Sequence, residues 1–147
     1  NLNLQLKIIG DGYEKKNLIK FSKLNKLNVK FYGAIYDLKK IKKICEKSQF
    51  GIYPGDAGLS VVQFMSLSIV PIIHNNFQKH LGPEPRYVNK KNGIFFTREN
   101  LPSLTKVLLE LFQMDTKSIY TLSKNSYQTY LNLNKVKMSD KLIRILK

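Results

Sequence analysis

The residues best suited to chemistry stand in short segments that follow apolar runs. Residues 54–60, Pro-Gly-Asp-Ala-Gly-Leu-Ser, combine two glycines with small polar groups and lead into a helical pattern. Glycine lets the backbone approach a ligand closely, and free N–H groups at the start of a helix attract anions. We therefore predict a phosphate-type anion site at Gly58, Leu59 and Ser60, although a plain tight turn would explain the glycines equally well.

The elements that position this segment alternate between strand and helix, which is typical of parallel βαβ units. In such sheets ligands bind beyond the carboxyl ends of the strands, so residues 10–14, 33–36, 54–60 and 74–86 should line one edge. Asp37 and Asn100 are predicted helix N-caps. Strands are expected at 4–9, 29–32, 50–53, 70–73 and 94–96, helices at about 13–27, 38–47, 58–68 and 101–112, and one or two amphipathic helices within 116–147.

Length and charge limit the possibilities further. A chain of 147 residues suits one domain, and its net charge of +15 comes almost entirely from lysine. Three explanations stay open: a solvated basic surface, a face for anionic lipid headgroups or a lipid-phosphate acceptor, and nucleic-acid binding. The last is disfavoured because arginine and exposed aromatic residues are not concentrated. The single Cys45 and the start of the chain predict a cytoplasmic protein, with attachment to the inner face of the membrane as an option.

Five segments in a fixed order, residues 6–12, 29–33, 58–60, 70–73 and 92–96, resemble the C-terminal domain of family 4 glycosyltransferases with the GT-B fold. Residues 54–59, 74–77 and 83–84 look like a subgroup from bacterial capsule and surface-polysaccharide clusters. The resemblance implies a Rossmann-like three-layer α/β domain with a parallel sheet, closing with C-terminal helices. It places a nucleotide-sugar-binding domain at 1–114, without its first βα unit, and a helical extension at 115–147.

The resemblance also implies roles for individual residues. Two family glutamates fall on Gly55 and Gln63, so both carboxylates are missing; the amide of Gln63 is left to bind the ribose. Of the other candidates, His80 is expected to be merely exposed, and His74 and Asp56 can equally be structural. The implied assignments are the donor diphosphate at Gly58, Leu59 and Ser60, the base beside Gly33, Ile35 and Tyr36, and the donor sugar near Gly55, Asp56, His74 and Glu84.

The implied activity is transfer of a sugar from a nucleotide-diphosphate sugar to a polysaccharide or lipid-linked glycan, with retention at the anomeric carbon. No cofactor and no metal are expected, because two histidines and one cysteine lack a ligand spacing. A GT-B N-terminal domain is the expected partner, without which this chain should be inactive. The alternatives are a catalytically inactive nucleotide-sugar or partner-binding module and a basic nucleic-acid-binding domain.

Overall fold

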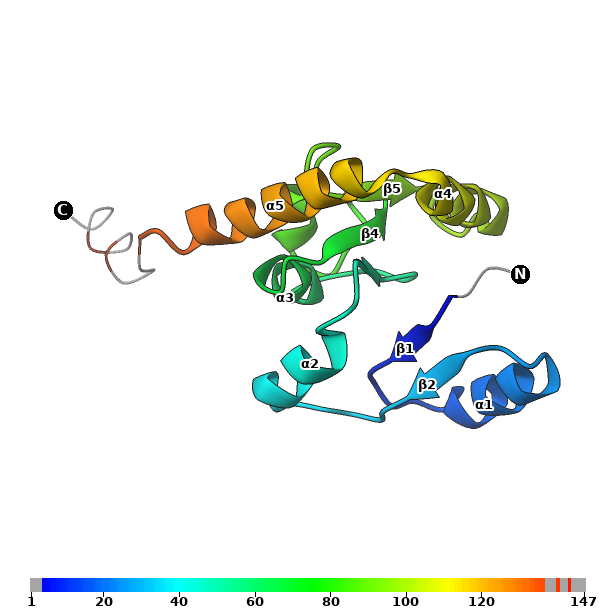
Figure 1. Ribbon diagram of the computed structural model, residues 1–147. Helices are drawn as coiled ribbons and strands as arrows, with labels where there is room; N and C mark the ends of the chain where they lie inside the picture. The colour runs from blue at the N-terminus through cyan, green and yellow to red at the C-terminus, as the bar shows by residue number, and fades with distance from the viewer. Residues whose placement is uncertain (1–3, 137–139, 141–142, 144–147) are drawn as a thin grey trace. The chain divides into compact units, whose positions relative to one another are not determined.

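Parallel strands joined by helices make up both parts of the chain (Figure 1). The computed structural model describes residues 4–136, 140 and 143. The chain forms two units, Asn1–Lys47 and Ser48–Lys147. The predicted parallel α/β architecture is confirmed in both units, because every strand pair of the described residues is parallel.

The first unit is a βαβ unit followed by a helix. Strands β1 (Leu6–Ile8) and β2 (Val29–Phe31) pair in parallel, with Leu6 opposite Val29 and Ile8 opposite Phe31. Helix α1 (Lys15–Leu24) connects them, and α2 (Leu38–Cys45) follows. Asp37 caps α2 as predicted, because its carboxylate accepts the N–H groups of Lys39 and Lys40.

The apolar stripe of α1 does not form a core. Leu18, Phe21 and Leu24 are 46%, 59% and 72% exposed, and Ser22 is the buried residue of the helix. The helix itself is where the spacing predicted it. The stripe stays uncovered within this unit because two strands of three residues each offer α1 little apolar surface to pack on.

The second unit holds a three-stranded parallel sheet in the order β3-β4-β5. Strand β4 lies in the middle and is buried along its whole length. Ile72 pairs with Ile52 on one side and with Ile94 on the other. The elements are β3 (Phe50–Ile52), α3 (Ser60–Ser66), β4 (Val70–His74), the 3-10 helix η1 (Glu84–Tyr87), β5 (Ile94–Phe96), α4 (Leu101–Gln113) and α5 (Thr116–Leu133).

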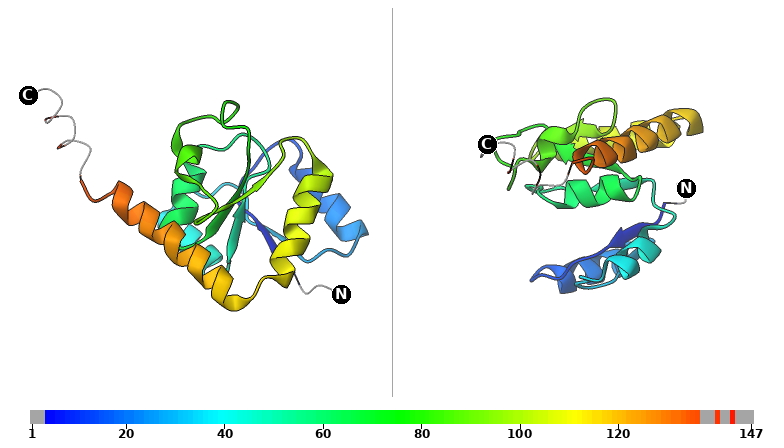
Figure 2. Two further views of the ribbon diagram at one scale, coloured as in Figure 1. Left: turned by 90° about the horizontal axis from the view of Figure 1, so that it is seen from above. Right: turned by 90° about the vertical axis from the view of Figure 1, so that its left-hand side faces the viewer.

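Helices cover both faces of this sheet, which makes three layers (Figure 2). On one face, Val61 and Met65 of α3 pack with Ile73 of β4 and with Tyr130 of α5. The opposite face carries a separate cluster that α4 completes. Its members are the buried Ile72, Phe96 and Leu111 and the partly buried Phe50, Ile52, Ile94, Leu104, Val107, Leu108 and Met114. Side chains of successive strand residues point to opposite faces, so Ile72 and Ile73 fall into different clusters.

Helix α5 belongs to the second unit rather than reaching away from it. Two of its serines form hydrogen bonds to the backbone between α3 and β4: Ser123 Oγ donates to the carbonyl of Ser68 at 2.6 Å and Ser126 Oγ to that of Ile69 at 2.9 Å. Ser126 is fully buried. The second tail helix expected beyond residue 134 falls largely outside the described residues, and the domain boundary at 114/115 stays a prediction.

Candidate functional site at the carboxyl edge of the second sheet

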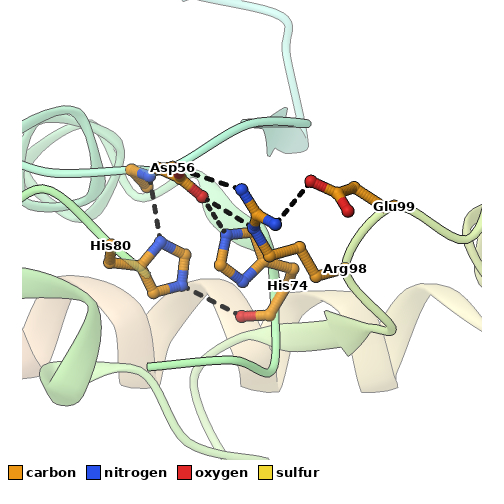
Figure 3. A network of polar contacts seen from close by, with 6 residues as sticks. Asp56, His74, His80, Arg98 and Glu99 are labelled. Atoms are coloured by element: carbon orange, nitrogen blue, oxygen red, sulfur yellow. Dashed lines mark hydrogen bonds and ion pairs between the residues drawn. The ribbon is translucent and has the colours of Figure 1, made fainter. Parts of the chain in front are cut away.

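Polar side chains converge where the three strands of the second sheet end (Figure 3). Asp56 follows β3, His74 is the last residue of β4, and Arg98 lies two residues beyond β5. His80 comes from the loop after β4. These four residues, with Glu99 beside Arg98, form the edge network. The carboxyl ends of parallel strands meet at one edge, so residues up to 42 positions apart become neighbours there.

Asp56 is the centre of the edge network. Its Oδ1 accepts hydrogen bonds from His74 Nε2 and from Arg98 Nε, both at 3.0 Å, and its Oδ2 accepts one from Arg98 Nη2 at 3.3 Å. The hydrogen bond from Arg98 is the largest of the effects that hold the pKa of Asp56 below its ordinary value, and the hydrogen bond from His74 is the next. The same pairing raises the pKa of the Arg98 guanidinium, which also donates to Glu99. Asp56 is therefore an ionised carboxylate with both oxygens engaged.

His80 has a defined tautomer because both ring nitrogens are engaged. The N–H of Ala57 donates to Nδ1 at 2.9 Å, and Nε2 lies 3.0 Å from the carbonyl of His74, to which it must donate. Nδ1 is thus unprotonated and Nε2 carries the hydrogen, as in neutral imidazole. Burial, the largest cause, lowers the pKa of His80. His80 is half-buried, so the expectation that it is merely exposed was wrong.

His74, the last residue of β4, is fully buried. Its Nε2–H donates to Asp56, and the edge of its ring meets Phe96, with 6.2 Å between the centroids. The other nitrogen, Nδ1, is buried and has no hydrogen-bond partner in the described part of the chain. No hydrogen bond joins His74 to a Ser, Thr or Cys side chain among the described residues, so the arrangement does not form a Ser/His/Asp-type triad.

Only some of the predicted donor-sugar residues are shown in contact with one another. Asp56 and His74 lie in direct contact, as described above. Gly55 is exposed, with nothing within 4 Å of where a Cβ would stand. Glu84 begins η1, and its carboxylate lies directly over Gly82. The structure thus shows Asp56 and His74 as one cluster, whereas their contact with a sugar stays a prediction.

The predicted diphosphate residues form the end of the 54–59 loop and the start of α3. The N–H groups of Gly58, Leu59 and Ser60 donate to no acceptor within residues 4–136. Leu59 is 75% exposed, whereas the hydroxyl oxygen of Ser60 is buried and unpartnered among those residues. Gln63 is half-buried and its side-chain amide forms no hydrogen bond within the same range. The backbone is free to meet a ligand, but the Ser60 hydroxyl is covered from solvent.

The predicted base-binding residues belong to the first unit. Gly33 has a positive φ of 71°, a conformation that glycine adopts readily, and its carbonyl accepts the N–H of Gly10 at 2.7 Å. Ile35 is half-buried and Tyr36 is 91% exposed. Residues 33–36 follow β2 as a loop, as the pattern predicted, and the role of these residues stays a prediction.

Two members of the edge network, Arg98 and His80, were missed as functional candidates by the sequence reasoning. Arg98 had a usable signal: it follows the last predicted strand, and the loop after that strand belongs to the same sheet edge as residues 54–60 and 74–86, which were inspected. His80 had none, because its contact with Ala57 spans 23 residues and depends on the path of the loop.

Other surfaces of the described residues add little chemistry. A shallow open depression runs along α4, lined by Leu101, Thr105 and Leu109 among others, and includes none of the predicted site residues. Within the described chain no three His, Cys, Asp or Glu side chains are grouped as a metal site would require. No helix of the same residues has the length and apolar character needed to cross a bilayer.

Comparison with solved structures shows which known fold this chain shares. No family model and no curated protein matches the sequence. A TarM structure superposes with a TM-score of 0.74 at 17% identity, covering 99% of this chain and 28% of TarM. Sucrose-phosphate synthase from Thermosynechococcus elongatus gives 0.71 at 18%, covering 88% of this chain and 34% of that one. The chain has the fold of a GT-B glycosyltransferase domain.

The same fold is seen with ligands in other neighbours. Anabaena HepE in complex with UDP-glucose gives a TM-score of 0.66 at 16% identity, covering 90% of this chain and 37% of HepE. The chain therefore spans between 28% and 37% of the length of these three glycosyltransferases. The three-layer, Rossmann-like architecture of the prediction is confirmed, whereas the particular family and the capsule subgroup stay predictions.

Proposed function

We propose that this chain is the donor-binding domain of a glycosyltransferase that uses a nucleotide-diphosphate sugar. The observation that carries the proposal is the likeness of its backbone to glycosyltransferases over 88% to 99% of the chain. Structures of HepE with UDP-glucose and of a TarM variant with UDP support a nucleotide-sugar ligand for this fold. The acceptor is a hydroxyl of a polysaccharide or lipid-linked glycan, and an N-terminal domain completes the enzyme.

The 54–59 loop and the first residue of α3 are the proposed diphosphate contact. The N–H groups of Gly58, Leu59 and Ser60 have no acceptor within residues 4–136, so they are available to phosphate oxygens. Donors that are already oriented stabilise the charge that develops on a departing nucleoside diphosphate. Such a role needs neither a side-chain nucleophile nor a metal. Gln63 is the proposed ribose contact through its amide.

Replacement of one amide tests this assignment. Leu59 has φ −55°, close to the value that proline imposes. Leu59→Pro therefore removes the N–H donor while matching the backbone at that residue, and Leu59→Ala removes the exposed side chain but keeps the donor. We expect Leu59→Pro to weaken UDP binding by about tenfold, equivalent to about 1.4 kcal/mol, in isothermal titration calorimetry. Leu59→Ala should bind as the parent does.

Equal UDP affinity in both Leu59 variants, with both folded by circular dichroism, would remove the backbone of residues 58–60 from the proposed site. The same titration with GDP, UDP-glucose and GDP-mannose identifies the base and the sugar. Failure of the unmodified chain to bind any of the four ligands would refute the donor-binding function itself.

A catalytically inactive binding module is the second candidate. It is favoured by Gly55 and Gln63, which stand where the family resemblance expects carboxylates. Such a module binds the nucleotide sugar but does not hydrolyse or transfer it. Sugar transfer measured with the chain joined to its proposed N-terminal domain separates the two, because turnover would exclude the inactive module.

A further inference from the structure

The 54–59 loop is held in place by side chains from two other loops of the second unit. We infer that His80 and Arg98 are positioning residues for this loop: His80 acts through Ala57 and Arg98 through Asp56. The inference rests on the proposed function, in which the end of the loop meets the donor diphosphate. It assigns both residues an effect on nucleotide binding without a contact to the nucleotide.

Ala57 is the first point of attachment. Its N–H donates to His80 Nδ1 at 2.9 Å, and its carbonyl accepts the N–H of Leu81 at 2.9 Å. Both backbone polar groups of Ala57 are thus bound by consecutive residues of the loop after β4. Ala57 is fully buried and forms part of the core with Val61 and Ile73. The loop is fixed here by two hydrogen bonds and by packing.

Asp56 is the second point of attachment. Arg98 Nε and Nη2 reach its two carboxylate oxygens, and His74 donates to one of them (Figure 3). Planar two-point contacts of this kind fix direction as well as distance. His80 uses both ring nitrogens, so it has no unused polar group to offer a ligand, and Arg98 is bound to Asp56 through two of its nitrogens. The inferred contribution of these two residues to binding is therefore one of orientation.

The fixed part of the loop leads directly to its free part. Asp56 and Ala57 are anchored, whereas the next two N–H groups, those of Gly58 and Leu59, donate to no acceptor within residues 4–136. Ordering a loop at the moment of binding costs affinity, and a loop that is already ordered avoids this cost. Loss of the anchor should consequently weaken nucleotide binding even though no ligand contact is removed.

Two substitutions of His80 separate positioning from general stability. An asparagine amide oxygen stands near the place of Nδ1 and can accept the Ala57 N–H, whereas a glutamine amide reaches the place of Nε2 and can donate to the His74 carbonyl. Both variants lose the imidazole ring. We expect His80→Asn to bind UDP within about twofold of the parent and His80→Gln to bind about tenfold more weakly, at matched melting temperatures. Arg98→Gln should weaken binding as His80→Gln does.

A second readout does not depend on the ligand. Hydrogen exchange of the Ala57 amide, followed by NMR, should be fast in His80→Gln and slow in the parent and in His80→Asn. The Tyr53 amide, which donates to the Ile72 carbonyl at 3.0 Å, is the internal reference and should not change.

Equal loss of UDP affinity in the two His80 variants, or unchanged Ala57 exchange in His80→Gln, would overturn the positioning role. If the parent chain binds none of UDP, GDP, UDP-glucose and GDP-mannose, the proposed function fails, and the exchange experiment alone decides whether His80 holds the loop. The two failures are therefore distinguishable.

Discussion

The rings of His74 and His80 stack nearly parallel, with 3.8 Å between their centroids and 6° between their planes. His80 also donates to the backbone carbonyl of His74, so it is bound to both the ring and the main chain of the same residue. One imidazole of the pair is fully buried and the other is half-buried. The pH of the solution should therefore affect the stability of the sheet edge.

The first prediction concerns that pH dependence. The pKa of His80 is lowered in the folded chain by burial and by the charges of His74 and Arg98, against opposing effects of the His74 carbonyl and Asp56. Below about 6.5, the ordinary value for histidine, the unfolded chain binds more protons at this residue than the folded chain. The free energy of unfolding should therefore fall as the pH falls below about 6.5, by at most about 1.4 kcal/mol per pH unit.

Urea unfolding between pH 5 and pH 8 measures this slope. His80→Asn removes the titrating group and should flatten the slope across the window. Asp56 affects stability at lower pH. Its pKa is depressed in the folded chain, so the stability that it contributes is present at pH values above the ordinary aspartate pKa and is lost as the pH falls through the folded pKa. A slope that persists unchanged in His80→Asn would assign the effect to another group.

The second prediction compares two glycines. A Cβ on Gly51 would lie 2.6 Å from the ring of Phe64, whereas a Cβ on Gly55 would meet nothing within 4 Å. We expect Gly51→Ala to lower the free energy of unfolding by about 1–3 kcal/mol through overpacking. Gly55→Ala should raise it by about 0.4–1 kcal/mol, since the unfolded chain loses conformational freedom. Chemical denaturation of both variants checks this, and similar effects at both positions would contradict the packing of α3 on β3.

The third prediction tests the core on the α3 face of the sheet. Met65 is fully buried and packs in the cluster with Val61 and Ile73. Met65→Ala should lower the free energy of unfolding by about 2–5 kcal/mol, because it removes buried contacts and leaves a cavity. Leu59→Ala is the matched control, since Leu59 is 75% exposed; its effect should stay within about 0.5 kcal/mol. A small loss for Met65→Ala would mean that this face is loosely packed.

The fourth prediction concerns the start of α4. Asn100 Oδ1 accepts the N–H of Ser103 at 2.8 Å and so satisfies one donor of the first turn. Asn100→Ala should cost about 1 kcal/mol of stability in thermal or urea unfolding. Thr105→Ala, an exposed change inside the same helix, should be neutral or slightly stabilising because alanine has the higher helix propensity. Equal effects of the two changes would exclude a capping role for Asn100.

Local features of the chain were predictable because neighbouring residues form them. Asp37 and Asn100 start their helices through side chains that reach N–H groups two or three residues away. The strands at 50–52 and 94–96 lie inside the predicted runs and are parallel, as the alternation with helices indicated. The helix of α1 was predictable from its spacing, but the exposure of its apolar stripe depends on how much surface lies opposite, about which the spacing says nothing.

The sequence by itself determined the order of elements, the parallel pairing and two of the loops that meet at the edge of the second sheet, 54–60 and 74–86, because hydrophobic periodicity and capping act over a few residues. Only the tertiary structure decided which polar groups pair. Asp56 and Arg98 are 42 residues apart, and His80 finds Ala57 across 23. Such pairs depend on the paths that the loops take over the folded sheet. Buried polar atoms need hydrogen-bond partners there, but the sequence does not indicate which residue each of them will meet.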